Sequence, residues 1–156
     1  ASFSGVYRRF NILCQSDTIV YIDDYAHHPN ELEASIISIR EMYPDKKITG
    51  IFQPHLYTRT RDFADEFAEV LSTLDELILI DIYPARELPI AGVNPNLILN
   101  KMTLDKKQYC PKAKLISFLE QRDDLELVVS FGAGDIEALV PAIKDTLRSK
   151  IKVKKN

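Results

Sequence analysis

A nearly continuous apolar run at Glu76–Ile82, closed by Tyr83-Pro84, constrains the fold of this chain more than any other stretch. Runs that lack polar–apolar alternation are typical of parallel strands that are covered on both faces. Three further stretches also predict strands: 18–23, 47–52 and 125–131. Helical patterns separate these strands, and such alternation favours an α/β fold with a mostly parallel, doubly wound, Rossmann-like sheet.

The remaining elements bring the predicted sheet to about six strands. Residues 8–14 predict a strand, and a turn at Ser16-Asp17 joins it as a hairpin to the next one, which adds one antiparallel edge strand. A short strand is expected at Lys107–Cys110. Helices on both faces are expected at 29–43, 62–74, 95–102, 114–122 and after 135 to about 151, with a break or restart at Pro141.

The composition predicts one globular domain over residues 1–156, since 46% of the residues are hydrophobic and 28% are charged. No stretch approaches the roughly 18 apolar residues of a membrane helix, and no signal peptide opens the chain, so a cytoplasmic location is expected. A net charge of −3 argues against a nucleic-acid partner. Cys14 and Cys110 are expected to be buried free thiols.

The strand at 18–23 leads into a turn that is dense in functional groups, Asp23–Pro29, with two carboxylates, a phenol and two imidazoles. Pro29 suits the first turn of the helix that follows. In open α/β sheets, ligands bind in the crevice at the carboxyl ends of the strands. The turn is therefore expected to line a binding site.

Two other loops that follow predicted strands carry functional groups, Gln53–Arg61 and Gly132–Asp135. All three histidines of the chain lie in the first of these loops or in the Asp23–Pro29 turn: His27, His28 and His55. In a parallel sheet, such loops meet at the same edge. Their coincidence favours a binding edge more than any single residue does.

Each of these groups also has a purely structural interpretation. The residues that can act as helix caps are Asp23, Asp24, His27, His28, Thr58, Thr60 and Asp62. Arg59 and Arg61 can be solvated, and Gly132 and Gly134 can serve only a tight turn. Taken together, however, the three loops favour binding.

The chemistry of this edge suits an anion or a nucleotide. Arginine presents a fixed fork of donors to phosphate or carboxylate, and Asp24 at a strand end suits the hydroxyls of a ribose. The chain has neither Gly-x-x-x-x-Gly-Lys-Ser/Thr nor a complete Gly-x-Gly-x-x-Gly. The residues alone therefore predict a nucleotide- or carboxylate-binding domain that lacks a phosphate cradle.

Five motifs cover nearly the whole chain in a specific order and spacing: Arg8–Phe10, Asp23–Pro29, Phe52–Thr60, Asp81–Ala85 and Gly132–Ile136. Together they resemble the C-terminal domain of the Mur ligases. The paired histidines with Gln53-Pro54-His55 are most similar to the branch that joins L-alanine to UDP-N-acetylmuramate.

The resemblance implies that the complete protein is an ATP-dependent carboxylate–amine ligase of peptidoglycan precursor synthesis, with three domains. ATP would phosphorylate the lactyl carboxylate of UDP-N-acetylmuramate, and the amine of L-alanine would attack the acyl phosphate. A central ATPase domain outside this chain would hold the triphosphate and Mg2+. This chain alone is therefore expected to be inactive.

The resemblance also implies roles for individual residues. Contacts to ATP are expected at Arg9, Asp24 and Tyr25. Contacts to the amino-acid substrate are expected at His28, His55 and Arg59. Further candidates at the same edge are His27, Arg61, Gly132, Gly134 and Asp135. No residue of this chain is expected to be a metal ligand.

Leu56 departs from the family pattern, which usually has arginine directly after Gln-Pro-His, so Arg59 or Arg61 alone would contact the substrate carboxylate. Two alternatives to this function remain open. One is the C-terminal domain of the related ligase that attaches a ready-made tripeptide to the same UDP-sugar. The other is a metal-dependent hydrolase with the ligands Asp24, His27, His28 and His55, although their spacing matches no recognised metal site.

Overall fold

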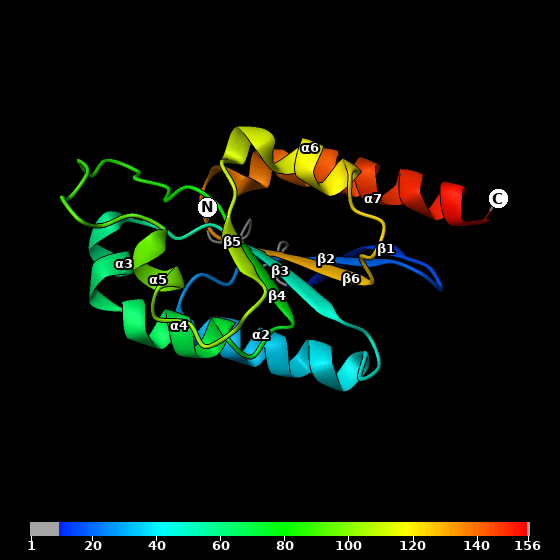
Figure 1. Cartoon of the computed structure of the whole chain (residues 1–156), viewed down its shortest axis with the longest axis horizontal. Helices are drawn as coiled ribbons and strands as arrows, with labels where there is room; N and C mark the ends of the chain where they lie inside the picture. The colour runs from blue at the N-terminus through cyan, green and yellow to red at the C-terminus, as the bar shows by residue number, and fades with distance from the viewer. Residues whose placement is uncertain (1–9, 156) are drawn as a thin grey trace.

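The computed structural model describes the backbone of residues 10–155 and the side chains of residues 10–151, which form a six-stranded sheet between two layers of helices (Figure 1). The strands are β1 (Asn11–Gln15), β2 (Val20–Asp24), β3 (Ile48–Phe52), β4 (Glu76–Leu79), β5 (Lys107–Tyr109) and β6 (Leu127–Phe131). Their order across the sheet is β1-β2-β6-β3-β4-β5. β1 pairs with β2 in the antiparallel sense, and the other pairs are parallel. The predicted sheet is confirmed.

Helices cover both faces of the sheet, as predicted (Figure 1). One face is covered by α2 (Pro29–Met42), α4 (Ala64–Leu71) and α5 (Asn96–Leu99). The other face is covered by α6 (Leu115–Glu120) and α7 (Val140–Lys155). Three short elements complete the described chain: α3 (Tyr57–Asp62) and the 3-10 turns η1 (Lys112–Lys114) and η2 (Asp135–Leu139).

The side chains of each central strand alternate between two hydrophobic cores. In β2, Val20 and Ile22 belong to the core that contains Leu32 of α2, whereas Tyr21 belongs to the core that contains Ile143 of α7. All five side chains of β2 are buried. Because helices cover both faces, both sets of strand positions must be apolar, which explains the runs without alternation.

Two element boundaries differ from the sequence expectation. The helix expected at 62–74 is instead two helices, α3 and α4, because Phe63 leaves the helical conformation with φ −117° and ψ 20°. β4 ends at Leu79 rather than at residue 82. Beyond it, the backbone pairs with the segment after β3 again in an isolated parallel bridge between Tyr83 and His55. The carboxylate of Asp81 accepts hydrogen bonds from the Tyr109 hydroxyl and from the Lys112 N–H group.

The other expected elements are present with shorter bounds. The helix expected at 95–102 is the single turn α5, and the one expected at 114–122 is η1 followed by α6. Pro141 lies in the first turn of α7, directly after η2, which confirms the predicted restart. Cys14 and Cys110 are free and buried, as expected. None of the helices in the described part of the chain has the length and apolar character needed to cross a membrane.

Candidate functional site

The carboxyl ends of β2, β6, β3 and β4 lie in register at one edge of the sheet. Asp24 is opposite Phe131, Phe131 is opposite Phe52, and Phe52 is opposite Leu79. Beyond the strands, the Gln53 N–H donates to the Phe131 carbonyl at 3.1 Å. The loops after these strands are therefore neighbours, and the expectation that the three loops with functional groups meet at one edge is confirmed.

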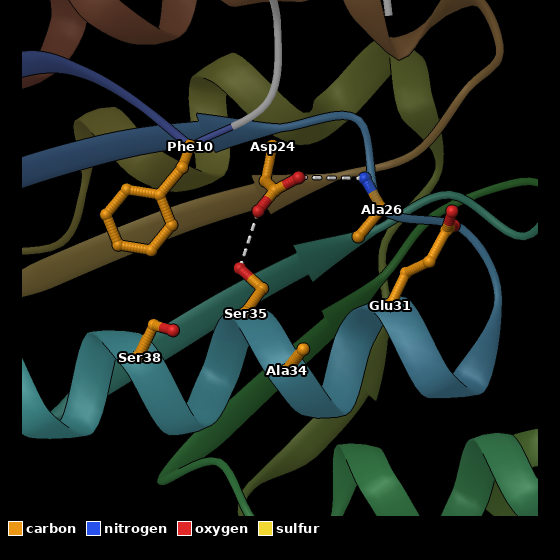
Figure 2. A pocket seen from close by; sticks show the side chains of 7 residues that line it. All are labelled: Phe10, Asp24, Ala26, Glu31, Ala34, Ser35 and Ser38. Carbon is orange, nitrogen blue, oxygen red and sulfur yellow. Dashed lines mark hydrogen bonds between the residues drawn. The ribbon is translucent and has the colours of Figure 1, made fainter. Parts of the chain in front are cut away.

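Asp24 lies in the wall of a pocket of about 230 Å³ between the end of β2 and α2 (Figure 2). The residue is only 3% exposed, and its carboxylate accepts hydrogen bonds from the Ala26 N–H at 3.0 Å and from the Ser35 hydroxyl at 2.6 Å. A carboxylate has about four lone-pair sites, so Asp24 can accept further hydrogen bonds from a ligand. The pocket is lined by Phe10, Asp24, Ala26, Glu31, Ala34, Ser35 and Ser38.

The N-cap residue of α2 is His28, which the sequence offered as a cap, and neither Asp23 nor Asp24 takes this position. Glu31, three residues further on, completes a capping box. Its carboxylate accepts hydrogen bonds from the N–H groups of His27 and His28, both at 3.1 Å. Asp23 instead accepts a hydrogen bond from the Ser130 hydroxyl of β6 at 2.7 Å. The turn after β2 is thus held by contacts on both sides.

The turn after β2 meets the loops after β3 and β4, and together they group three imidazole rings with two tyrosine rings. The His27 ring centroid lies 4.7 Å from that of His28 and 5.8 Å from that of His55. Tyr25 lies 5.3 Å from His27, and Tyr83 lies 5.4 Å from His55. The three histidines, which come from two different loops, therefore form one cluster.

Arg59 of α3 lies close enough to this cluster to affect its titration. Burial, followed by the charges of Arg59 and His27, lowers the pKa of His28. Burial, followed by the charges of His27 and Arg59, lowers the pKa of His55. Both imidazoles are therefore neutral at neutral pH. Among the described residues, the buried Nδ1 atom of His55 has no hydrogen-bond partner.

The two arginines that the sequence left open differ in their contacts. The Arg61 Nε atom forms an ion pair with Asp62 at 2.9 Å, and both side chains are about half exposed. Within residues 10–151, the Arg59 guanidinium has neither an ion pair nor a hydrogen bond. A free guanidinium next to neutral imidazoles can accept a carboxylate as its partner.

Gln53 ties the loop after β3 to the loop after β6. Its side chain is 1% exposed, and its amide donates to Asp135 at 2.6 Å while its carbonyl oxygen accepts from the Ile136 N–H at 2.9 Å. Asp135 also pairs with Lys112 at 2.5 Å. Gly134 packs so closely against this group that a Cβ there would lie 2.6 Å from the Gln53 Oε1 atom. Both Gln53 and Lys112 are residues whose role the sequence did not reveal.

Glu87 is a third residue that sequence reasoning missed. It lies in the loop after β4, and its carboxylate accepts hydrogen bonds from the backbone of Tyr57 and from both the backbone and the hydroxyl of Thr58. No local motif marks this position. The only signal is its place in a loop that follows a strand, at the edge where the other functional loops lie.

The sequence model of a family described as Mur ligase, glutamate ligase domain, matches residues 8–142. The chain belongs to the Mur ligase family. The UDP-N-acetylmuramate–L-alanine ligase of Parabacteroides distasonis is 52% identical to it over 152 residues, which is 97% of this chain and 33% of that protein. This Mur ligase domain thus spans about one third of the length of the curated relatives it matches.

Solved structures of Mur ligases share the fold. The UDP-N-acetylmuramate-alanine ligase of Thermotoga maritima superimposes with a TM-score of 0.68 at 25% identity, covering 94% of this chain and 30% of that one. The murein peptide ligase of Psychrobacter arcticus gives a TM-score of 0.70 at 17% identity, covering 90% of this chain and 30% of that one. The second likeness concerns the fold alone.

The structure of this Mur ligase domain brings most of the candidate site residues to one edge. The residues that lie there are Asp24, Tyr25, His27, His28, His55, Arg59, Gly132, Gly134 and Asp135. Arg61 lies in the same helix as Arg59 and pairs with its neighbour Asp62, and Arg9 lies outside the described residues. Among the residues described, no three or more His, Cys, Asp or Glu side chains are grouped to hold a metal ion, and family membership argues against the hydrolase alternative.

The stability of this Mur ligase domain should fall as the pH drops below about 6.5, the ordinary pKa of imidazole. Because the folded state lowers the pKa of His28 and His55, the unfolded chain binds more protons at pH values between the folded pKa and 6.5. Their contribution to stability is therefore complete above 6.5 and is lost as the pH falls through the folded pKa. Urea unfolding at a series of pH values measures this, and a His28→Gln/His55→Gln variant with an unchanged slope would contradict it.

Proposed function

We propose that this chain is the C-terminal domain of an ATP-dependent ligase that joins L-alanine to UDP-N-acetylmuramate in peptidoglycan precursor synthesis. The observation that carries the proposal is the 52% identity, over 97% of the chain, to a ligase of that name. Because the chain spans 33% of that relative, the complete active site is proposed to include a UDP-sugar domain and a central ATPase domain. The amide bond would form through an acyl-phosphate intermediate.

The pocket at Asp24 is proposed to take the nucleoside part of ATP. Phe10 and Ala34 provide apolar contacts, and Asp24 and Ser38 provide oxygen atoms that suit ribose hydroxyls. Arg9, which directly precedes Phe10, and Tyr25 remain proposed ATP contacts. ATP supplies the phosphoryl group that activates the substrate carboxylate. Mg2+ is proposed to be held with the triphosphate by the central domain, as in the family that the chain belongs to.

Arg59 is proposed to bind the carboxylate of L-alanine, with His28 and His55 beside it. A guanidinium presents paired donors that match the two oxygens of a carboxylate. The neutral imidazoles can each donate or accept a hydrogen bond without repelling an amino group that arrives next to the carboxylate. Such fixed contacts speed the reaction mainly by holding the amine near the acyl phosphate.

The second candidate is the ligase that attaches a ready-made tripeptide. Its support is the shared fold with a murein peptide ligase at 17% identity, which is weaker than the 52% identity to L-alanine ligases. Phosphate release by the full-length protein, with UDP-N-acetylmuramate and ATP plus either L-alanine or the tripeptide, tests the proposal. L-alanine should support turnover and the tripeptide should not. The 156-residue chain alone should support neither reaction.

Replacing Arg59 with alanine should raise the KM for L-alanine by roughly 10- to 100-fold, since a hydrogen bond to a charged group contributes about 1.5–3 kcal/mol. The KM for ATP should change far less. Arg61→Ala is the matched control, because the Arg61 guanidinium already pairs with Asp62. If Arg61→Ala rather than Arg59→Ala produced the selective effect, the assignment of Arg59 would be wrong.

A further inference from the structure

The helix that carries Arg59 has no cap of its own. α3 begins after Leu56, whose apolar side chain cannot accept a hydrogen bond from the first N–H groups of the helix. The Glu87 carboxylate supplies the acceptors instead: Oε1 accepts from the Tyr57 N–H at 2.6 Å and from the Thr58 N–H at 3.1 Å, and Oε2 accepts from the Thr58 hydroxyl at 2.5 Å.

The start of α3 depends on this contact more than a typical helix start does. Leu56 has φ +72°, in the left-handed region that residues other than glycine rarely adopt, so the turn into the helix is intrinsically unfavourable. α3 is only six residues long, and helices of that length are not stable by themselves. The position of the helix must therefore be determined by tertiary contacts.

The loop that carries Glu87 is itself joined to the loop after β3. The Tyr83 N–H donates to the Pro54 carbonyl and the Leu56 N–H donates to the Tyr83 carbonyl, both at 2.8 Å. The Tyr83 ring lies 5.4 Å from that of His55. Glu87 thus extends a series of contacts that runs along the chain from Pro54 to Thr58, and the next residue is Arg59.

Arg59 has no ion pair or hydrogen bond of its own within the described side chains, so the placement of α3 determines where its guanidinium lies. We propose that Glu87 is a positioning residue for the amino-acid substrate: by holding the start of α3, it keeps Arg59 next to His28 and His55. The inference rests on the proposed function, because it assumes that Arg59 binds the substrate carboxylate. Glu87 itself is not proposed to touch the substrate.

The first test is steady-state kinetics on the full-length protein. Glu87→Ala should raise the KM for L-alanine by roughly tenfold or more, since small misplacements of a binding group have effects of up to about 100-fold. The KM for ATP should stay within about threefold, as expected for a contact outside the ATP site. Glu87→Gln keeps one acceptor oxygen and should lie between Glu87→Ala and the unsubstituted protein. Leu88→Ala, at a neighbouring side chain that is 83% exposed, should change neither constant.

The second test asks whether Glu87 acts through Arg59. On an Arg59→Ala background, Glu87→Ala should raise the KM for L-alanine by less than about twofold, because the group that Glu87 positions is already missing. Independent, multiplying effects of the two substitutions would overturn the proposal. If Glu87→Ala failed to fold, activity with all substrates would fall together. The KM of the Glu87→Gln variant for L-alanine would then decide.

The outcomes separate this inference from the proposed function. If the unsubstituted full-length protein shows no L-alanine-dependent phosphate release, the proposed function fails, and the role of Glu87 in amino-acid binding fails with it. If that activity is present and Glu87→Ala leaves the KM for L-alanine unchanged, only the role of Glu87 is overturned. A selective rise in this KM that disappears on the Arg59→Ala background supports both.

Discussion

Replacing Arg122 with alanine should lower the free energy of unfolding by about 3–5 kcal/mol, the usual effect of removing one partner from a buried ion pair. Arg122 donates two hydrogen bonds to the Glu76 carboxylate, at 2.8 and 2.9 Å, and Glu76 is only 3% exposed. Thr49 donates a further hydrogen bond to Glu76 at 3.1 Å. Without Arg122, a carboxylate would remain buried without its main counter-charge.

The matched control for Arg122→Ala is Lys101→Ala, which removes the surface ion pair with Asp65. The side chains of Lys101 and Asp65 are 42% and 81% exposed, so its loss should change the stability by less than about 1 kcal/mol. Urea unfolding of both variants gives the comparison. Equal losses of unfolding free energy in the two variants would show that the Arg122–Glu76 pair stabilises the fold no more than a surface ion pair does.

The position of this ion pair allows stability and function to be tested separately. Glu76 is the first residue of β4, so the pair lies at the amino ends of the parallel strands. The histidine cluster and the Asp24 pocket lie at the carboxyl ends. Arg122→Ala should therefore reduce stability while leaving the KM values of the folded full-length protein close to those of the unsubstituted one.

The fold could be predicted from the sequence because the strands are buried on both faces. The apolar run that begins at Glu76 and the run that ends at Phe131 both correspond to central strands, β4 and β6. The order of the strands could not be predicted, because β6 lies between β2 and β3 although it comes last in the chain. That placement follows from long-range packing, which no local pattern encodes.

The break between α3 and α4 shows where local periodicity failed. Phe63, Phe67 and Leu71 have the spacing of one face of the helix expected at 62–74, but Phe63 is 41% exposed whereas the other two are fully buried. The start of α3 is held by Glu87, which comes from a different loop. Tertiary hydrogen bonds of this kind override local propensity in short helices.

The candidate site was predictable in its location and less so in its contacts. Their place in loops that follow predicted parallel strands put His28, His55 and Arg59 at one edge, and the structure brings them together. Sequence reasoning offered Asp24 as a helix cap or as a ribose contact. Its carboxylate in fact binds the Ser35 hydroxyl on α2, eleven residues further along the chain. The role of Asp24 toward a ribose stays a prediction.

Replacing Gly134 with alanine should reduce kcat/KM for L-alanine in the full-length protein by roughly 10- to 100-fold. A Cβ there would lie 2.5 Å from the Tyr83 Cγ atom and 2.6 Å from the Gln53 Oε1 atom, so both side chains must move. The backbone of Gly134 has a negative φ of −95°, so the main effect of the added Cβ is its steric contact with these two side chains. Moving Gln53 weakens its hydrogen bond to the Ile136 N–H, and moving Tyr83 displaces the ring next to His55.

Gly92→Ala is the control that separates lost stability from lost site geometry. Gly92 has φ +80°, and a Cβ there would meet nothing within 4 Å, so alanine adds only backbone strain of about 1–2 kcal/mol. Overpacking at Gly134 should destabilise by a similar amount, about 1–3 kcal/mol. The two variants should therefore have similar melting temperatures in thermal unfolding, while only Gly134→Ala loses activity toward L-alanine. If both variants lost activity in proportion to their stability, the loop around Gly134 would have no particular part in substrate binding.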